Sequence, residues 1–321
     1  MNDLTIAILS IVAVANIILG LVIFSRGLKS LADILFGLIA LSTTIWSIAI
    51  IGFYMEQYHL LINWIIVTHS MAILIPFFFL SFSLNFPGKL ARSNEIISIA
   101  FIPLVYFEYL IFFGNTVIGV TQGNTYQIGI GYIYFSLTLV IFFFLGFFFS
   151  LLQIRKANNQ IEKRQAQYVL VGSLLASTLA LIPDLILPYF QIFGYTWLGP
   201  IFTLIMVVSL FLAMLKYSLF NIKVILTEIV SIAIVVALLL ELFIAQSSTE
   251  IFLKTIVLII VTIFSFLLIK GVYREVAQRE RIEKLAEDLE RANKHLTELD
   301  RQKSEFVSFA THQLRAPLTA M

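Results

Sequence analysis

Residues 4–24 read LTIAILSIVAVANIILGLVIF, an uncharged run long enough to cross the hydrocarbon core of a bilayer as one helix. Similar runs recur near 31–54, 61–85, 96–113, 132–153, 167–188, 199–219, 225–245 and 252–270. These runs predict an all-α fold, a polytopic transmembrane bundle of about nine helices, because only helices and closed barrels satisfy the backbone inside lipid.

The composition supports the same conclusion. The 321 residues are 60% hydrophobic and only 12% charged, against roughly 25% charged in a soluble domain. Because so few charged residues could not cover this much apolar surface in water, we expect the chain to lie in the lipid bilayer. The chain contains no cysteine, which excludes disulfides, thiolate metal ligands and cysteine nucleophiles. We expect no metal and no cofactor to be bound by this chain, and no nucleic acid partner.

Basic residues predict the orientation of the spans, because cytoplasmic loops collect lysine and arginine. The sequence before the first run lacks the positive region of a cleavable signal peptide, so that run is expected to be retained. Alternate loops contain Arg26 and Lys29, Lys89 and Arg92, Arg155 to Arg164, then Lys216 and Lys223. Lys254 is the exception on the other side. The N-terminus is therefore expected outside and the charged tail in the cytoplasm, in a multi-pass protein of the inner (plasma) membrane.

The longest segment expected outside is 115–131. It is uncharged and contains Thr, Gln, Tyr and Gly, and we expect a short hairpin or a plug over the bundle. It is too small for an extracellular ligand-binding domain. A signal would therefore be read within the membrane or at its outer face.

Ionisable side chains inside a membrane are costly and are candidates for function. Four fall in the outer halves of their predicted spans: His69, Glu108, Asp184 and Glu241. Asp184 lies between Pro183 and Pro188, where the helix backbone is expected to open. These residues predict a hydrophilic sensor pocket near the outer face. The alternative is that they reach the interface or bond to nearby Ser and Thr side chains.

After Lys270 and Gly271 the continuous apolar pattern ends, and Gly271 is a candidate switch position at this boundary. The apolar residues that follow are spaced 3, 4, 3, 4, 3, at Ile282, Leu285, Leu289, Ala292, Leu296 and Leu299. This spacing is typical of a left-handed coiled coil. On the solvated face, three ion pairs between residues four apart are expected: Glu280–Lys284, Glu287–Arg291 and Glu290–Lys294. We predict a parallel homodimer; the alternative is a solitary solvated helix.

The same register places Lys303 and Ala310 at the first seam position, Phe306 at the second, and His312 outside the seam, facing water. From Val272 to Ala310 the helix would extend on the order of 60 Å at 1.5 Å per residue. No folded module fits between the membrane and His312, so the ninth span is expected to connect directly to this histidine.

The sequence around His312 resembles the first helix of the dimerisation and phosphoacceptor domain of sensor histidine kinases. The matching elements are Lys303-Ser-Glu-Phe306, Ala310-Thr-His312, Leu314-Arg315, Pro317-Leu318 and Thr319. The resemblance implies that His312 accepts a phosphoryl group from ATP and passes it to a cytoplasmic response regulator. ATP and Mg²⁺ would be bound by a catalytic domain expected after Met321, because residues 1–321 show no nucleotide-binding boxes. This chain is therefore not expected to be an active ATP-dependent protein histidine kinase alone.

Three neighbours of His312 bear on this chemistry. The family places an acidic residue directly after the histidine, whereas this chain has Gln313, whose amide can orient the ring but cannot act as a base. Ala316 stands where phosphatase-competent members have Thr or Asn, which leaves phosphatase activity doubtful. Pro317 lacks an N–H and loosens the helix beside the histidine, as a switch would require.

The membrane half resembles the seven-helix N-terminal sensor region of many bacterial histidine kinases. The resemblance rests on 41–47 with Trp46, on Ile75-Pro76 with 77–82, on 182–188, and on 216–222. It implies four parts: a seven-helix sensor at 1–223, two further spans at 224–270, a coiled-coil helix at 271–300, and the partial phosphoacceptor helix at 301–321.

The sequence thus favours the sensor part of a two-component histidine kinase. The alternative is a non-catalytic membrane receptor or transporter with a dimerising coiled-coil tail. A transporter would be expected to show internal repeats or several broken helices, and the residues around His312 would have no purpose in it.

Overall fold

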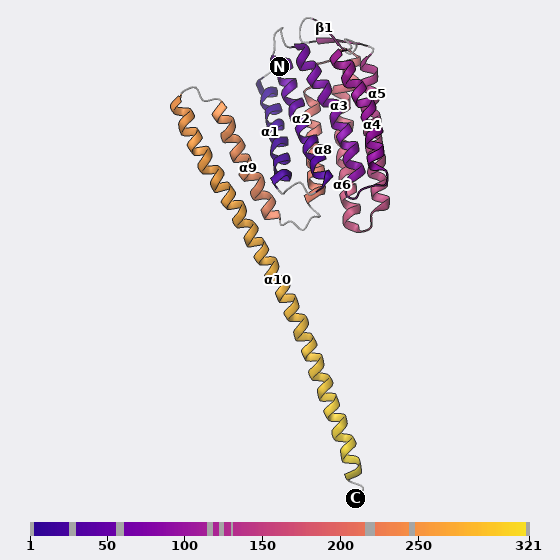
Figure 1. Cartoon of the computed structure of the whole chain (residues 1–321), viewed down its shortest axis with the longest axis vertical. Helices are drawn as coiled ribbons and strands as arrows, with labels where there is room; N and C mark the ends of the chain where they lie inside the picture. The colour runs from indigo at the N-terminus through magenta and orange to yellow at the C-terminus, as the bar shows by residue number, and fades with distance from the viewer. Residues whose placement is uncertain are drawn as a thin grey trace. The chain divides into compact units, whose positions relative to one another are not determined.

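The computed structural model describes residues 3–25, 30–55, 61–113, 118–121, 125–129, 131–215, 222–243 and 248–318. The chain divides into two compact units, Met1–Val261 and Thr262–Met321. Its helices are α1 Asp3–Ser25, α2 Leu31–Met55, α3 Leu61–Asn85, α4 Ser93–Phe113, α5 Gly131–Lys156, α6 Gln160–Leu181, α7 Leu187–Tyr189, α8 Leu198–Leu215, α9 Ile222–Phe243 and α10 Ser248–Leu318 (Figure 1). A π-helix, η1, covers Ile182–Ile186, and two strands, β1 Ile118–Thr121 and β2 Thr125–Ile128, follow α4.

Within the described residues, eight helices are long and apolar enough to cross a membrane. They fall on eight of the predicted runs. The remaining run, 225–245, falls on α9, whose described apolar stretch is Thr227–Val236. The predicted all-α polytopic fold is therefore confirmed, with one short hairpin as the β structure in the described part of the chain.

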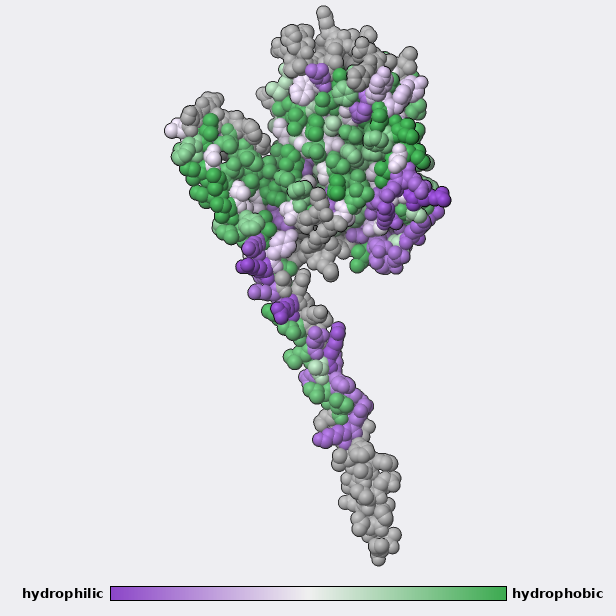
Figure 2. All heavy atoms as spheres, viewed as in Figure 1, coloured by the Kyte–Doolittle hydropathy of each residue, from purple (hydrophilic) through white to green (hydrophobic). Residues whose placement is uncertain are grey.

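The centre of the bundle is formed by α2 and α3. α2 packs against α1, α3 and α8, and α3 packs also against α4 and α5, while α6 packs against α5 and α8. The largest fully buried side chains are mostly aromatic: Phe36, Phe79, Phe82, Phe107, Tyr132 and Phe142. The faces that point outward carry exposed apolar side chains, such as Phe101, Ile102 and Phe144, and they form a broad apolar surface (Figure 2). Such a surface is expected where lipid is the solvent.

Small residues allow the closest helix contacts, as is usual in membrane bundles. A Cβ at Gly172 of α6 would overlap the side chain of Ser209 on α8. Ser209 Oγ also donates a hydrogen bond of 2.7 Å to the carbonyl of Tyr168 on α6. A Cβ at Gly146 of α5 would lie 2.5 Å from the ring of Phe79 on α3. These glycines fix the distances between their helices.

The strands β1 and β2 pair antiparallel, with Ile118 opposite Ile128 and Thr121 opposite Thr125. This is the hairpin expected for segment 115–131. It lies at one end of the bundle, called here the hairpin end (Figure 1). The opposite, basic end includes the exposed Arg155 and Lys156 at the end of α5.

Side-chain caps begin two of the helices. Ser30 precedes α2, and Asp33 Oδ2 accepts hydrogen bonds from the Ser30 N–H at 2.7 Å and the Ser30 hydroxyl at 2.9 Å. Asn159 caps α6 by accepting the Glu162 N–H at 2.8 Å. The first N–H groups of a helix have no partner within the helix, and polar side chains can accept hydrogen bonds from them. This is why polar residues stand between the apolar runs at these two helix starts.

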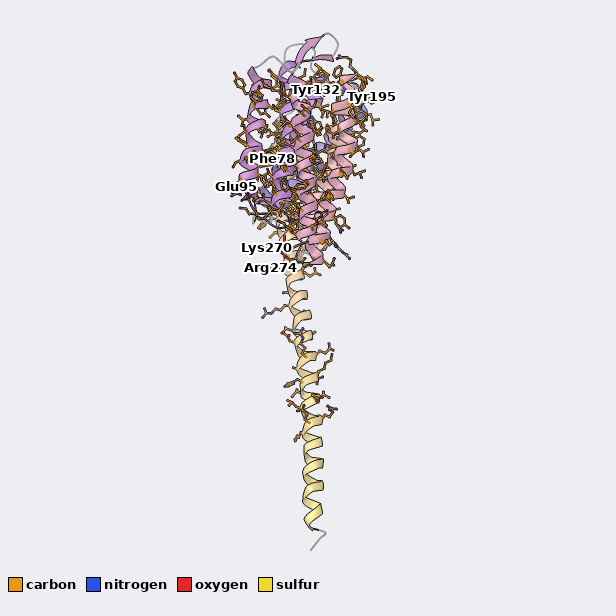
Figure 3. All side chains as sticks on the ribbon, turned by 90° about the vertical axis from the view of Figure 1, so that its right-hand side faces the viewer. Phe78, Glu95, Tyr132, Tyr195, Lys270 and Arg274 are labelled. Atoms are coloured by element: carbon orange, nitrogen blue, oxygen red, sulfur yellow. The ribbon has the colours of Figure 1, made fainter. Side chains whose placement is uncertain are left out.

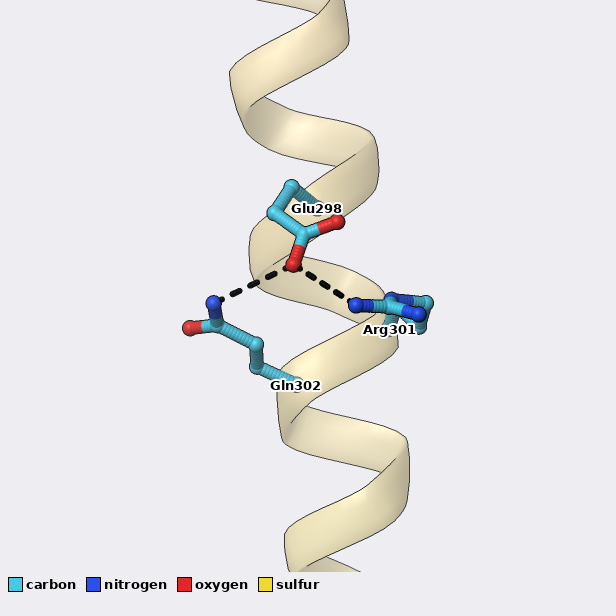
Figure 4. Close-up of polar contacts among 3 residues, drawn as sticks. All are labelled: Glu298, Arg301 and Gln302. Atoms are coloured by element: carbon cyan, nitrogen blue, oxygen red, sulfur yellow. Dashed lines mark hydrogen bonds and ion pairs between the residues drawn. The ribbon is translucent and has the colours of Figure 1, made fainter.

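The unit Thr262–Met321 is helical as far as Leu318. It passes through Gly271 without a break, and a Cβ at Gly271 would meet no atom within 4 Å. The expected Glu290–Lys294 pair is present at 2.7 Å, and Glu298 Oε1 accepts from Arg301 at 3.0 Å and Gln302 at 3.3 Å (Figure 4). The pairs Glu280–Lys284 and Glu287–Arg291 involve side chains outside the described residues.

Candidate functional site

Asp184 lies where the helical geometry changes. α6 ends at Leu181, and residues Ile182–Ile186 form the π-helix η1 before the short helix α7. Pro183 and Pro188 flank Asp184, and each lacks the N–H that a regular helix uses. The opened backbone expected from the two prolines is therefore present as a π-helix, a feature that is frequent at functional sites.

Contacts from two other helices hold Asp184 in place. The Tyr132 hydroxyl of α5 donates a 3.0 Å hydrogen bond to the Asp184 carbonyl. On α8, Gly199 leaves room for the carboxyl, because a Cβ there would overlap it. The carboxyl oxygen Oδ2 is shielded from solvent and has no hydrogen-bond partner among the described residues. Tyr132 is near the hairpin end (Figure 3), which places Asp184 near that end too.

A cavity of about 80 Å³ opens beside Asp184. Its walls come from α2, α3, α5, α6, η1 and α8 and include Trp46, His69, Phe135, Asp184 and Thr203. Trp46 Nε1 is buried and has no hydrogen-bond partner within the described part of the chain. Two residues that line the cavity, Trp46 and Asp184, thus each contain a buried polar atom without a hydrogen-bond partner among the described residues. The volume of the cavity suits several water molecules or a small polar ligand.

The ring of His69 is buried in the same wall, with 6% of the residue exposed. Its Nδ1 lies 2.9 Å from the Ile65 carbonyl, and because a carbonyl can only accept, Nδ1 carries the hydrogen. The ring packs edge-on against Phe135 and Tyr132, with centroid distances of 5.2 and 6.1 Å. The structure therefore brings His69 and Asp184, two of the residues singled out by the sequence, to one cavity.

The other two candidates lie elsewhere. Glu108 on α4 accepts a 2.7 Å hydrogen bond from the hydroxyl of Ser70 and is not among the residues that line the cavity. Glu241 belongs to α9, but its side chain lies outside the described residues. Among the described residues, no group of three or more His, Cys, Asp or Glu side chains is placed to hold a metal ion.

We predict that Asp184→Asn stabilises the protein. A carboxylate with a buried, unpaired oxygen such as Asp184 Oδ2 costs free energy, and the neutral amide of equal size costs less, so the gain is expected to be about 1–3 kcal/mol. Thermal unfolding in detergent should show a higher midpoint for the variant.

Asp33→Asn is the matched control, because the Asp33 carboxylate has two hydrogen-bond partners on Ser30. That variant should unfold at a lower temperature than the natural protein. A lower unfolding midpoint for Asp184→Asn would mean that the carboxylate stabilises the fold, and it would argue against the cavity as a functional site.

The second candidate region is α10, which contains His312. α10 is helical through His312, Gln313 and Pro317 as far as Leu318. The side chains from 304 onward lie outside the described residues. The seam residues before them are exposed: Ile282 65%, Leu285 60%, Leu289 72%, Leu296 64% and Leu299 47%. These side chains form an apolar stripe on an otherwise charged helix.

Comparison with known families gives one match. Residues 8–223 fit the family described as the N-terminal 7TM region of histidine kinase. No curated protein matches the chain. The matched residues include the whole of α2 to α8, and with them all the residues that line the cavity beside Asp184.

Proposed function

The chain belongs to the histidine kinase family with an N-terminal 7TM region, and we propose that it is the sensor part of a two-component kinase. In this proposal the membrane bundle receives a signal and passes it along α10 to His312. The phosphoryl group that His312 accepts is then transferred to a response regulator.

The observation that carries the proposal is the apolar stripe of α10. Leu285, Leu289 and Leu296 are each at least 60% exposed, although burial of a leucine side chain contributes about 1.5–3 kcal/mol. A spacing of alternating three and four residues buries such a stripe against a second helix in a coiled coil, and a second copy of this chain offers an identical stripe. The stripe therefore supports a homodimer in which two copies of α10 pair.

Pairing along this stripe would leave His312 on the outer surface of the pair. A neutral imidazole nitrogen there can attack the γ-phosphorus of ATP; the bond to the bridging oxygen breaks, and ADP leaves with the released pair of electrons. ATP and Mg²⁺ would be supplied by a separate catalytic domain. The amide of Gln313 would orient the ring, and Pro317 would loosen the last turn as the helix changes state.

We propose that the cavity beside Asp184 is the sensor site, with His69 as its second polar residue. The distribution of lysine and arginine supports an orientation with the N-terminus outside and α10 ending in the cytoplasm. The hairpin end would then face outward, and the cavity would be open to a small polar signal from that side. Glu108 and Glu241 remain candidates in a lesser role, and Gly271 remains a candidate switch.

The test is phosphorylation in membranes that contain the protein expressed from its whole gene. With ATP labelled at the γ position, we expect label on the protein that is lost in acid and retained in alkali, as for phosphohistidine, and that moves to a response regulator. A lack of label, or label stable in acid, would favour the alternative of a receptor or transporter with a dimerising tail.

A further inference from the structure

The cavity beside Asp184 keeps two of its polar atoms away from solvent. Asp184 Oδ2 and Trp46 Nε1 are both buried, although Asp184 and Trp46 line the cavity. A polar signal gains hydrogen bonds to such atoms only after part of the wall has moved. A sensor site of this kind therefore requires a movable wall.

One part of the wall is not helical. Among the described residues that line the cavity, Thr196 alone lies outside the helices. It belongs to residues 190–197, which connect α7 to α8 and which we call the α7–α8 segment. Its neighbour Tyr195 lies near the hairpin end (Figure 3), the end that faces outward in the proposed orientation. An irregular segment with few packed neighbours opens at lower cost than a packed helix, so this segment is the part of the wall best suited to move.

A side chain of α2 holds the α7–α8 segment in place. The Tyr54 hydroxyl donates a hydrogen bond of 2.9 Å to the Phe193 carbonyl. A second hydrogen bond, of 3.0 Å, joins the hydroxyls of Tyr54 and Thr196. Because both bonds use the same Tyr54 oxygen, removal of that oxygen releases both. The hydroxyl thus ties α2 to the residue of the segment that lines the cavity.

The remaining contacts of the segment are on its inner side. Phe193 is buried in a cluster with Phe53 and Ile65. A Cβ at Gly194 would meet no atom within 4 Å. Three apolar side chains of the segment are exposed: Phe190, Ile192 and Tyr195. The described residues therefore leave the outer side of the segment uncovered, with room for it to move away from α2.

We propose that the α7–α8 segment is a lid over the cavity beside Asp184, and that the Tyr54 hydroxyl is its latch. The net contribution of a hydrogen bond to stability is small, because water replaces the lost partner. Two such bonds therefore keep the lid closed and still allow it to open. The lid rests on the proposed sensor function for its purpose, and it adds how access to the sensor site is regulated.

The lid can be tested by the access of a thiol reagent to the cavity. The chain contains no cysteine, and Thr203 of α8 lines the cavity, so Thr203→Cys serves as the reporter. The purified protein in phospholipid nanodiscs is treated with trimethylammonioethyl methanethiosulfonate, which does not cross bilayers. The thiolate forms a disulfide with the reagent, and methanesulfinate leaves. Mass spectrometry of the peptide that contains position 203 gives the rate.

We expect Tyr54→Phe to raise the rate of modification at position 203 about fivefold, because the rate follows the fraction of molecules with an open lid. This ratio corresponds to the loss of a hydrogen bond of about 1 kcal/mol. Thr196→Val removes the other hydroxyl of the latch and should raise the rate as well. The second variant keeps the test decisive if the first fails to fold.

Two controls accompany the reporter. Tyr106→Phe is the matched variant, because Tyr106 is exposed on α4 and is not among the residues that line the cavity; the rate at position 203 should stay as in the natural background. Lys156→Cys places the thiol on the exposed basic end, where Tyr54→Phe should leave the rate unchanged.

Equal rates at position 203 with and without the Tyr54 hydroxyl would overturn the latch. In the natural background, a rate at position 203 as high as that at position 156 would show that nothing covers the cavity, and it would overturn the lid. Both readings need neither signal nor ATP. Failure of the lid is therefore distinguishable from failure of the sensor function, which is read by phosphorylation.

Discussion

When the protein is expressed from its whole gene, membranes that contain its His312→Gln variant are expected to incorporate no acid-labile phosphate from ATP above the background of membranes without the protein. Glutamine keeps a polar side chain in the helix but has no imidazole nitrogen that can attack phosphorus. Without this nucleophile the phosphoryl transfer cannot take place at this position, whereas the loss of a neighbouring residue would only slow it. The measurement is label retained on the protein after separation under alkaline conditions.

His295→Gln is the control for this experiment. His295 lies on the same helix, is exposed, and precedes the residues that resemble the phosphoacceptor helix. Its variant should be phosphorylated as the natural protein is. If His312→Gln retained its label, the phosphoacceptor would be another residue, and His312 would not have the role that the resemblance implies.

Gly172→Ala is expected to lower the stability of the bundle strongly. The added Cβ would overlap both Oγ and Cβ of Ser209, so α6 and α8 would have to separate. Overpacking of this kind costs about 1–3 kcal/mol and occasionally more, and we expect the upper end because the obstacle is close to the α8 backbone. Thermal unfolding in detergent should show a clear fall in the midpoint.

The double variant Gly172→Ala with Ser209→Gly separates overlap from other causes. Without the Ser209 side chain, the new Cβ would lie 3.6 Å from the Ser209 Cα, which is an ordinary contact. We therefore expect the second substitution to recover most of the lost stability. The recovery is incomplete because the hydrogen bond from Ser209 to Tyr168 is lost and because glycine favours a helix less than serine does. A double variant less stable than Gly172→Ala alone would contradict the contact.

Most of the fold could be predicted from the sequence, since lipid imposes a simple rule on the chain. A segment such as 31–54 must satisfy its backbone internally, so an apolar run of that length becomes a helix whatever it packs against. The helix α2 accordingly ends within a residue of the predicted bound, at Met55. The hairpin β1–β2 followed from a long uncharged segment between two spans.

The site was predictable only in part. Asp184 could be found because two prolines flank it, and a proline acts on its own helix. Trp46 lines the cavity, and Gly199 and Tyr132 contact Asp184, yet these residues lie on three other helices. Which residues face each other depends on how each helix is rotated in the bundle, and no local pattern specifies that rotation. The same reason explains why Glu108 pairs with Ser70 and not with the residues around Asp184.

The central claim is that two copies of α10 pair along the stripe and carry the state of the bundle to His312. The chain contains no cysteine, so a single introduced cysteine reports on one position. Leu289 lies in the stripe and Lys294 lies on the solvated face, where it pairs with Glu290. Stripe positions of a parallel pair face each other across the seam, within the roughly 4.4–6.8 Å between Cα atoms that a disulfide requires.

Oxidation of membranes that contain the Leu289→Cys or the Lys294→Cys variant is the most direct measurement. The account predicts a disulfide-linked dimer for Leu289→Cys and a monomer for Lys294→Cys. Dimers in equal amounts for both variants, or none for Leu289→Cys, would contradict it.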